Sequence, residues 1–338
     1  MTDFLKKLRE KVCKQLSSQR VGYLLGAGSS YLNGNGYPLM TNLWDIIREN
    51  IPSPTQTEIQ SKLDEGADGI EAALDLLDDG GINDTPHRHL VTQAIAEHFC
   101  GLTPSLDIHA AFLKRISKRS DEVIPLFNLN YDPLFERAAD FSRLRLIDGF
   151  IGAENAYYDL NTFQQRIGVA RRSWRGRQFT IIQGNIHLYK LHGSLGWYES
   201  QSKGVRRCGF NLSIPEDAKR LMIPPQRRKA TDTMSIPYSS LWSELRAFIR
   251  HGPYLINRLV SIGYGMRDEH VNDVIENGLV RTDLTLMIFA RDLKDDVFNR
   301  WSNKENVIIV TNNRSSLNGE IGPGHPSLWD FEQLSKEV

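Results

Sequence analysis

The chain has 338 residues, and its 41 Lys plus Arg are balanced by 41 Asp plus Glu, a formal net charge of +0. With 40% hydrophobic and 24% charged residues it matches ordinary globular composition, which excludes disordered and low-complexity classes. Zero net charge argues against a surface that grips nucleic acid over its whole extent, so no direct nucleic-acid contact is expected. A chain of this length predicts two domains, or one large domain with a substantial insertion.

The number of cysteines and the hydropathy of the chain indicate the cellular compartment. Cys13, Cys100 and Cys208 are too few and too scattered for a disulfide framework or for any Cys-x-x-Cys zinc or redox motif, which fits a reducing cytoplasm. Residues 1–16 lack the apolar stretch of a signal peptide, and the longest apolar run, 284–290, is too short to span a bilayer. We therefore expect a cytoplasmic protein without membrane association.

Hydrophobic periodicity predicts an α/β fold. Residues 4–16 have an apolar residue every fourth position and predict an amphipathic helix that packs on the core. A buried strand over 21–25 follows, and residues 39–120 have helical periodicity. Further strands are predicted over residues 123–127, 179–182, 187–191, 259–263, 284–290 and 307–310. Helices are predicted over residues 133–143, 240–250, 269–276, 296–303 and 328–334, with a loop over 318–326.

This alternation predicts a Rossmann-like, mostly parallel sheet with helices on both faces and a helical insertion. We expect residues 1–31 and 121–338 to form the sheet domain and residues 32–120 to form the insertion. In such a sheet, ligands bind beyond the carboxyl ends of the strands. The residues that follow each predicted strand are therefore the first place to look for a site.

The first strand ends in a glycine turn. Gly26, Ala27, Gly28 and Ser29 follow it directly, and backbone N–H groups in such a turn can approach a pyrophosphate. The dehydrogenase pattern Gly-x-Gly-x-x-Gly is not met, because Tyr31 stands at the third glycine position. A tight turn without a ligand explains these residues as well as a nucleotide cradle does.

Three further strand ends carry polar or glycine-rich residues. Asn128, Asn130 and Asp132 follow the strand over 123–127, and Asp132 alone is equally well explained as a helix N-cap. His192 and Gly193 follow the strand over 187–191. The strand over 259–263 ends on Gly263. Tyr264 and Gly265 follow it, and then Asp268, Glu269 and His270, for which helix capping and dipole roles are favoured.

These blocks, in this order, resemble the sirtuin superfamily, and more closely the sirtuin-like NAD-consuming domains of prokaryotic antiphage defence systems. Gly36-Tyr37-Pro38 and Ile223-Pro224-Pro225 also resemble that branch. Deacylating sirtuins carry four zinc-binding cysteines after the His-Gly pair, whereas Cys208 is the one cysteine there in this chain. Because one thiolate cannot form a four-thiolate site, we expect no zinc and favour NAD cleavage over deacylation.

The resemblance implies a role for each strand end. His192 is the general base or the hydrogen-bond partner of the nicotinamide ribose, Asn130 positions the ribose or the attacking water, and Asp132 holds the carboxamide. The pyrophosphate is expected on the first glycine turn, and the adenosine near the last strands. The residues assigned to these two sets are Gly26, Ala27, Gly28 and Ser29, and Gly263, Tyr264, Thr311 and Asn312.

The expected activity is hydrolysis of NAD to nicotinamide and ADP-ribose, which depletes cellular NAD during phage infection. The alternatives are an NAD-dependent deacylase or ADP-ribosyltransferase, and a non-catalytic scaffold that senses NAD or ADP-ribose. The resemblance also implies a homo-oligomer that is regulated in trans by a HerA-type DNA-translocating ATPase or an Argonaute-type partner. The first helix, the helical insertion and a cluster of arginines are candidate contact surfaces, although a solvated loop is the favoured reading of that cluster. Its members are Arg166, Arg171, Arg172, Arg175 and Arg177.

Overall fold

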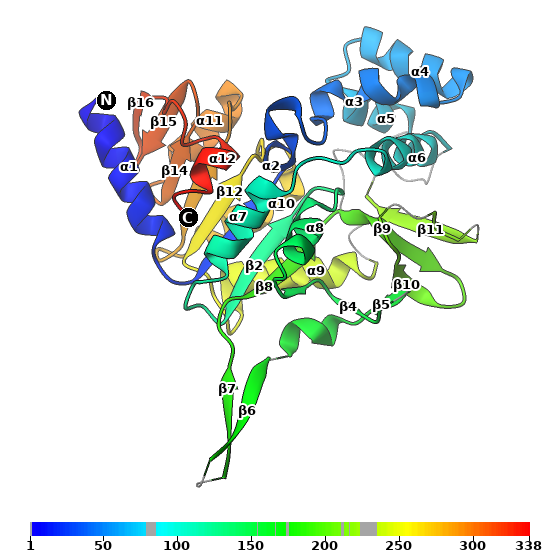
Figure 1. Ribbon diagram of the computed structural model, residues 1–338. Helices are drawn as coiled ribbons and strands as arrows, with labels where there is room; N and C mark the ends of the chain where they lie inside the picture. Colours follow the sequence, from blue (N-terminus) through cyan, green and yellow to red (C-terminus); the bar gives the residue numbers. More distant parts are fainter. Residues whose placement is uncertain are drawn as a thin grey trace.

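The computed structural model describes residues 2–78, 86–153, 155–165, 167–173, 176–210, 213–215, 217–223 and 235–338. Its main feature is a 9-stranded sheet with the order β16-β15-β14-β13-β12-β1-β2-β8-β3 (Figure 1). The bounds, in chain order, are β1 Val21–Leu25, β2 Val123–Asn128, β3 Leu146–Ile147, β8 Asn185–Lys190, β12 Arg258–Ile262, β13 Thr285–Phe289, β14 Val307–Val310, β15 Arg314–Leu317 and β16 Glu320–Pro323. Neighbours from β14 to β3 run parallel, and β15 and β16 are antiparallel additions. The predicted α/β fold with a mostly parallel sheet is confirmed.

Successive side chains of each strand point to opposite faces of the sheet, and both faces are covered by a hydrophobic cluster. In β1, Leu24 packs into one hydrophobic cluster, while Tyr23 and Leu25 pack into another. Helices α9 (Tyr238–Arg246), α10 (Glu269–Gly278) and α11 (Asp295–Ser302) contribute to the first cluster. The second cluster lies under α1 (Asp3–Leu16), α7 (Asp107–Ile116), α8 (Leu134–Phe141) and α12 (Phe331–Leu334). The stripe of α1 is buried as predicted.

A third hydrophobic cluster belongs to the helices between β1 and β2. It is built mainly by α3 (Met40–Ile47), α4 (Ser53–Asp64), α5 (Ile70–Leu77) and α6 (Pro86–Cys100), which lie together beside the large sheet (Figure 1). The short helix α2 (Gly28–Tyr31) leads into this group, whereas α7 packs on the sheet. The division of the chain into two domains stays a prediction. Among the described residues, no helix has the length and apolar character needed to cross a bilayer.

Two smaller sheets were not predicted as such. A five-stranded antiparallel sheet has the order β11 (Ala218–Met222), β9 (Gly193–Ser200), β10 (Gly204–Arg207), β5 (Ala156–Tyr158) and β4 (Phe150–Ile151). A separate two-stranded ribbon pairs β6 (Gly168–Ser173) with β7 (Gly176–Ile181). The predicted strand over 179–182 is therefore part of this ribbon and not of the large sheet. The expected loop over 318–326 contains strand β16, because its backbone pairs with β15.

One buried histidine makes the core sensitive to acid. His109 of α7 packs edge-on against Phe135, with ring centroids 4.7 Å apart, and against Phe331 at 5.1 Å. Burial lowers the pKa of His109 from 6.5 to about 3. Between these values the unfolded chain binds a proton that the folded chain does not, so stability falls as the pH falls below 6.5.

We expect His109 to remove about 2 kcal/mol of stability between pH 7 and pH 5, since one pKa unit corresponds to about 1.4 kcal/mol. His109→Phe retains an aromatic ring at this position but cannot bind a proton. Over the same pH range it should therefore lose about 2 kcal/mol less stability than the wild type. Urea denaturation of both proteins at the two pH values measures the difference. Equal pH dependence in the two proteins would show that His109 does not titrate as its burial requires.

Candidate functional site

The glycine turns after β1 and β12 pack directly against each other at the carboxyl edge of the sheet. A Cβ atom on Gly28 would lie 2.7 Å from the Cα of Gly263, and one on Gly26 would lie 2.6 Å from the Cα of Tyr264. The N–H groups of Gly26 and Gly28 donate to the carbonyls of Ile262 and Gly263, at 3.0 and 2.9 Å. Glycine is therefore needed here for close approach of two backbones. These two N–H groups are thus engaged in hydrogen bonds within the protein.

Gly263 and Gly265 form a matched pair for testing this contact. Gly263 has a φ of +64°, and its Cβ would lie 2.4 Å from the backbone nitrogen of Ser29, whereas a Cβ on Gly265 would meet nothing closer than 3.9 Å. We expect Gly263→Ala to destabilise the protein by more than about 2 kcal/mol, because it combines left-handed strain with a backbone clash. Gly265→Ala should change stability by less than about 0.5 kcal/mol. Thermal denaturation of both variants measures the two losses of stability. Similar losses would contradict the requirement for glycine at this backbone contact.

Asn130 is held at the end of β2 beside the first glycine turn. Its side-chain amide donates to the carbonyl of Gly26 at 3.0 Å and to the hydroxyl of Ser30 at 2.9 Å. Its backbone N–H donates to the Asn128 side chain at 2.8 Å. Ser29 is fully buried, and its hydroxyl donates to the carbonyl of Gly26 at 2.8 Å. Asn130 therefore joins the strand ends of β1 and β2, as their adjacency in the sheet requires.

Asp132 lies in a buried charged cluster behind Asn130. Its carboxylate accepts the N–H of Leu134, the first residue of α8, at 3.1 Å, although the N-cap residue of this helix is Pro133 and not Asp132. The fully buried Lys190 donates to the backbone carbonyl of Asp132 and lies 3.2 Å from the Glu136 carboxylate. Burial raises the pKa of Asp132 and of Glu136 above their usual values, and the Lys190 charge opposes that shift. The Lys190 charge thus offsets part of the cost of burying the Asp132 and Glu136 carboxyl groups.

His192, at the end of β8, is held from both sides of its ring. Its Nδ1 lies 3.2 Å from the carbonyl of Leu129, and its Nε2 lies 3.3 Å from the Asp268 carboxylate. A carbonyl can only accept, so Nδ1 carries the proton of the neutral ring, and Nε2 carries a second proton only in the charged ring, which then pairs with the Asp268 carboxylate. The other oxygen of Asp268 accepts the N–H groups of His270 and Val271 at the start of α10. The predicted N-cap is confirmed, and the same carboxyl group also orients His192.

The expected adenosine side opens onto a cavity of about 540 Å³. Gly28, Gly263 and Asn312 line it together with Arg291, which follows β13 and supplies a cation. Tyr264 does not line this cavity, because its hydroxyl is bound within its own loop, to the Asp268 carbonyl at 3.1 Å and the Asn272 side chain at 3.2 Å. Thr311 is buried, and its hydroxyl donates to the Arg314 carbonyl at 2.6 Å.

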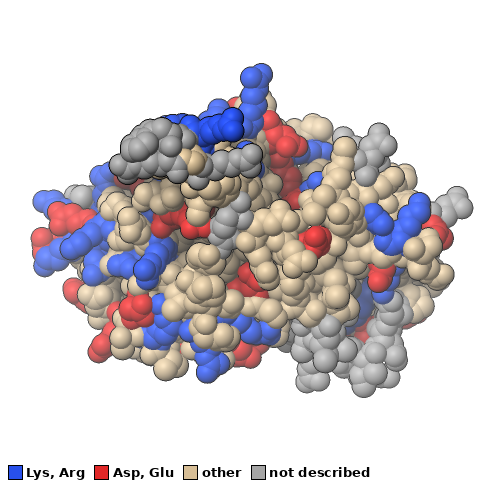
Figure 2. All heavy atoms as spheres, turned by 90° about the horizontal axis from the view of Figure 1, so that it is seen from below, with Lys and Arg blue, Asp and Glu red and all other residues tan. Residues whose placement is uncertain are grey.

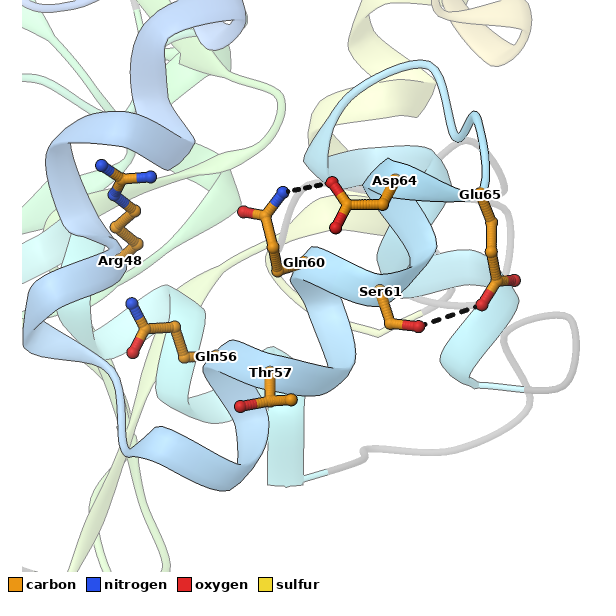
Figure 3. A pocket seen from close by; sticks show the side chains of 7 residues that line it. All are labelled: Arg48, Gln56, Thr57, Gln60, Ser61, Asp64 and Glu65. Carbon is orange, nitrogen blue, oxygen red and sulfur yellow. Dashed lines mark hydrogen bonds between the residues drawn. The ribbon is translucent and has the colours of Figure 1, made fainter.

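The predicted site residues thus divide into two neighbouring groups. Gly28, Gly263 and Asn312 line the cavity, whereas Asn130 is buried beside the first glycine turn and His192 between Leu129 and Asp268, with 9% and 4% of their surface exposed. A second hollow, of about 640 Å³, lies over α4 (Figure 3). Its polar lining includes Gln60 and Asp64, which bond to each other at 2.8 Å, and it contains none of the predicted site residues.

All three cysteines are free thiols. Within the described ranges, no three His, Cys, Asp or Glu side chains are grouped as a metal site requires. Pro224 and Pro225, and Arg166 and Arg175 of the arginine cluster, lie outside the described residues.

Comparison with known proteins decides the family. A family model described as a SIR2-like domain matches residues 125–310, more than half of the chain. The chain belongs to the SIR2-like family. A search of curated proteins finds no match. Similar solved structures include a Sir2 homolog in complex with NAD, at 13% identity and a TM-score of 0.47, which covers 97% of this chain and 94% of that one. Another is Sir2Tm bound to a propionylated peptide, at 12% identity and a TM-score of 0.46, with 98% and 97% covered.

Sequence reasoning gave three residues near these strand ends no role in the site. Lys190 is the last residue of its strand, where an apolar neighbourhood gave no hint of its two acidic neighbours. The contact of Asp268 with His192 joins residues 76 positions apart and depends on the order of the strands. Arg291 had a readable signal, because it follows the end of a parallel strand as the predicted residues do.

Proposed function

We propose that this SIR2-like protein hydrolyses NAD to nicotinamide and ADP-ribose. Membership of the family supports an NAD-related activity in general. The observation that carries the finer proposal is the arrangement of His192, whose Nδ1 faces a backbone carbonyl while its Nε2 faces the Asp268 carboxylate. A base beside a carboxylate, at the same carboxyl edge of the sheet as the cavity lined by Gly28 and Gly263, is suited to activating a hydroxyl group or a water molecule.

The reaction breaks the bond between the nicotinamide nitrogen and the ribose carbon. The bonding electrons leave with nicotinamide, which becomes neutral, and the ribose passes through an oxocarbenium-like state that water attacks. The new carbon–oxygen bond releases one proton, which Nε2 of His192 accepts directly or through a ribose hydroxyl. Asp268 then stabilises the imidazolium that forms. Asn130 positions the ribose or the water, and Arg291 faces the cavity where the anionic part of NAD is expected.

Hydrolysis is favoured over deacylation by the cysteine count. The zinc module of deacylating sirtuins needs four thiolates, and the chain has Cys208 alone after His192. We further propose that the protein works as a cytoplasmic homo-oligomer, that a HerA-type or Argonaute-type partner controls it, and that NAD depletion serves antiphage defence. These proposals rest on the resemblance described above.

The direct test is an assay of nicotinamide release from NAD by the purified full-length protein. It is run alone, with an acyl-lysine peptide, with an acceptor protein and with the product of a neighbouring gene. Release that needs no acyl group or acceptor supports hydrolysis. Release only with the peptide or the acceptor would establish a deacylase or transferase instead. Thermal stabilisation by NAD without any product would indicate a binding module.

A further inference from the structure

The outward face of α1 is basic. Residues 3–20, which comprise α1 and the turn after it, contain six basic and two acidic residues. The apolar stripe of the helix is buried, so its cations lie on the side that faces away from the core. Lys7 and Arg9 form ion pairs with nearby carboxylates. Lys14 is exposed and Lys11 is half-buried, and neither forms an ion pair with a residue of the described ranges.

The end of α7 extends this basic surface. Residues 114–119 contain four basic residues and no acidic one, and Lys114 and Lys118 are exposed. Arg119 donates to the carbonyl of Leu16 at 2.8 Å, which joins the end of α7 to the end of α1. Figure 2 views the molecule from below and shows blue side chains gathered on the left, the side of α1 in Figure 1, with a few red ones among them. We call the surface of α1 and the end of α7 the basic face.

The hollow over α4 has the opposite charge. Residues 45–68, which comprise α4 and its flanking segments, contain six acidic and two basic residues, and all six acidic residues are exposed. Asp64 and Glu65 line the hollow of about 640 Å³, and Arg48 is the one cation among its lining residues (Figure 3). We call it the acidic hollow. It contains no predicted residue of the NAD site, so that site does not explain it.

The lining of the acidic hollow is suited to the ammonium group of a lysine. Asp64 accepts a hydrogen bond from Gln60 at 2.8 Å, and Glu65 accepts from Ser61 at 3.0 Å and from Lys62 at 2.7 Å. These bonds hold the two carboxylates in place (Figure 3). A carboxylate has about four acceptor positions, so both groups retain capacity for a further donor, and an ammonium group carries three N–H donors. The hollow therefore favours a cationic partner.

The same chain supplies a surface that fits each of these two. α1 lies on one side of the molecule and α4 on the other, so one copy does not pair its own two surfaces (Figure 1). A nucleic acid or an anionic membrane would satisfy the basic face alone and would be repelled by the acidic hollow. A second copy satisfies both surfaces. Lys11 and Lys14 are three residues apart on α1, so they lie on one side of the helix and can approach the hollow together.

We propose that the basic face of one copy docks on the acidic hollow of a second copy. Each pair formed in this way leaves one basic face and one acidic hollow open at its ends. Such a head-to-tail contact continues until it closes into a ring or grows into a filament. The inference rests on the homo-oligomer of the proposed function, whose contact surfaces it identifies, and not on hydrolysis of NAD.

The test follows association of the full-length protein by sedimentation velocity without NAD. It is run at about 0.1 M and 1 M salt, where charges are screened over about 10 Å and 3 Å. The wild type should assemble at the lower salt and dissociate at the higher. Lys11→Glu/Lys14→Glu reverses the charge of the basic face, and Asp64→Lys/Glu65→Lys reverses that of the acidic hollow. Each variant should weaken association by at least about tenfold, because like charges then face each other.

A chain that carries both reversals identifies the partner of each surface. Its two surfaces are again opposite in charge, so it should assemble as the wild type does. The matched control is Lys203→Glu/Lys219→Glu, which reverses two exposed lysines of the antiparallel sheet and should leave association unchanged. Circular dichroism checks the fold of every variant. If the reversal on α1 does not fold, Lys11→Gln/Lys14→Gln takes its place and should still weaken association more than the control does.

Three results would overturn the proposal. The first is a wild type that stays monomeric at the lower salt. The second is a folded chain with both reversals that does not assemble, because the two surfaces would then not contact each other. The third is a control variant that weakens association as much as the reversal on α1, because the attraction would then be unspecific. Because NAD is absent from these samples, none of the results depends on whether the protein hydrolyses it.

Discussion

Replacing His192 with alanine should lower the rate of nicotinamide release from NAD by about 10²- to 10⁴-fold, the usual contribution of general acid–base catalysis. The physical reason is the position of the ring. The Leu129 carbonyl fixes the proton on Nδ1, and Asp268 lies 3.3 Å from Nε2. No other described imidazole has this environment at a carboxyl strand end of the sheet. The loss should therefore appear in kcat more than in KM.

The matched control for this prediction is His89→Ala, because His89 is exposed on α6 and touches none of the site residues. It should retain the wild-type rate. Circular dichroism and thermal denaturation check that the His192 variant is folded. Asn130→Ala is expected to abolish turnover as well, since its amide joins the ends of β1 and β2. A folded His192→Ala protein with full activity would refute the assignment of the base.

Replacing Lys190 with methionine should destabilise the protein by about 3–5 kcal/mol, the range found when one partner of a buried ion pair is removed. Lys190 is fully buried, donates to the Asp132 carbonyl and lies 3.2 Å from Glu136. Without it, two buried carboxyl groups lose their cation. Burial already raises the pKa of both groups, so the deficit should be smaller at pH 5 than at pH 7.

The sign of this pH effect follows from proton linkage. A carboxyl group with a raised pKa in the folded state binds a proton more readily there than in the unfolded chain, so stability falls as the pH rises through that interval. Urea denaturation at both pH values measures the effect. Lys294→Met is the control, because Lys294 forms an exposed ion pair with Asp68 at 2.9 Å and should change stability by less than about 1 kcal/mol. Similar losses in the two variants would contradict the importance of burial.

The fold was predictable from the sequence because its strands are continuous apolar runs separated by helical periodicity. That pattern located every parallel strand from β1 to β14 apart from the two-residue β3. The strands of the antiparallel sheet could not be found in the same way. They are short, as in β4 and β5, and their partners lie up to about 50 residues away, as for Tyr157 and Arg206. A strand such as β7 can also leave the main sheet, since local sequence does not say which neighbour it pairs with.

The candidate site likewise has one part that the sequence predicts and another that depends on the tertiary structure. The sequence by itself placed Gly26, Asn130 and His192 at strand ends, because hydrophobic runs stop where polar residues begin. Only the tertiary structure decided which of them meet, since strand order brings β12 beside β1 and β8 beside β2. It also showed that Asp268 caps α10 and faces His192 with the same side chain. Net charge likewise followed from composition, but only the fold showed that Lys190 is buried beside Glu136 and the Asp132 carbonyl. Composition records how many charges a chain carries, whereas folding determines which of them are brought together.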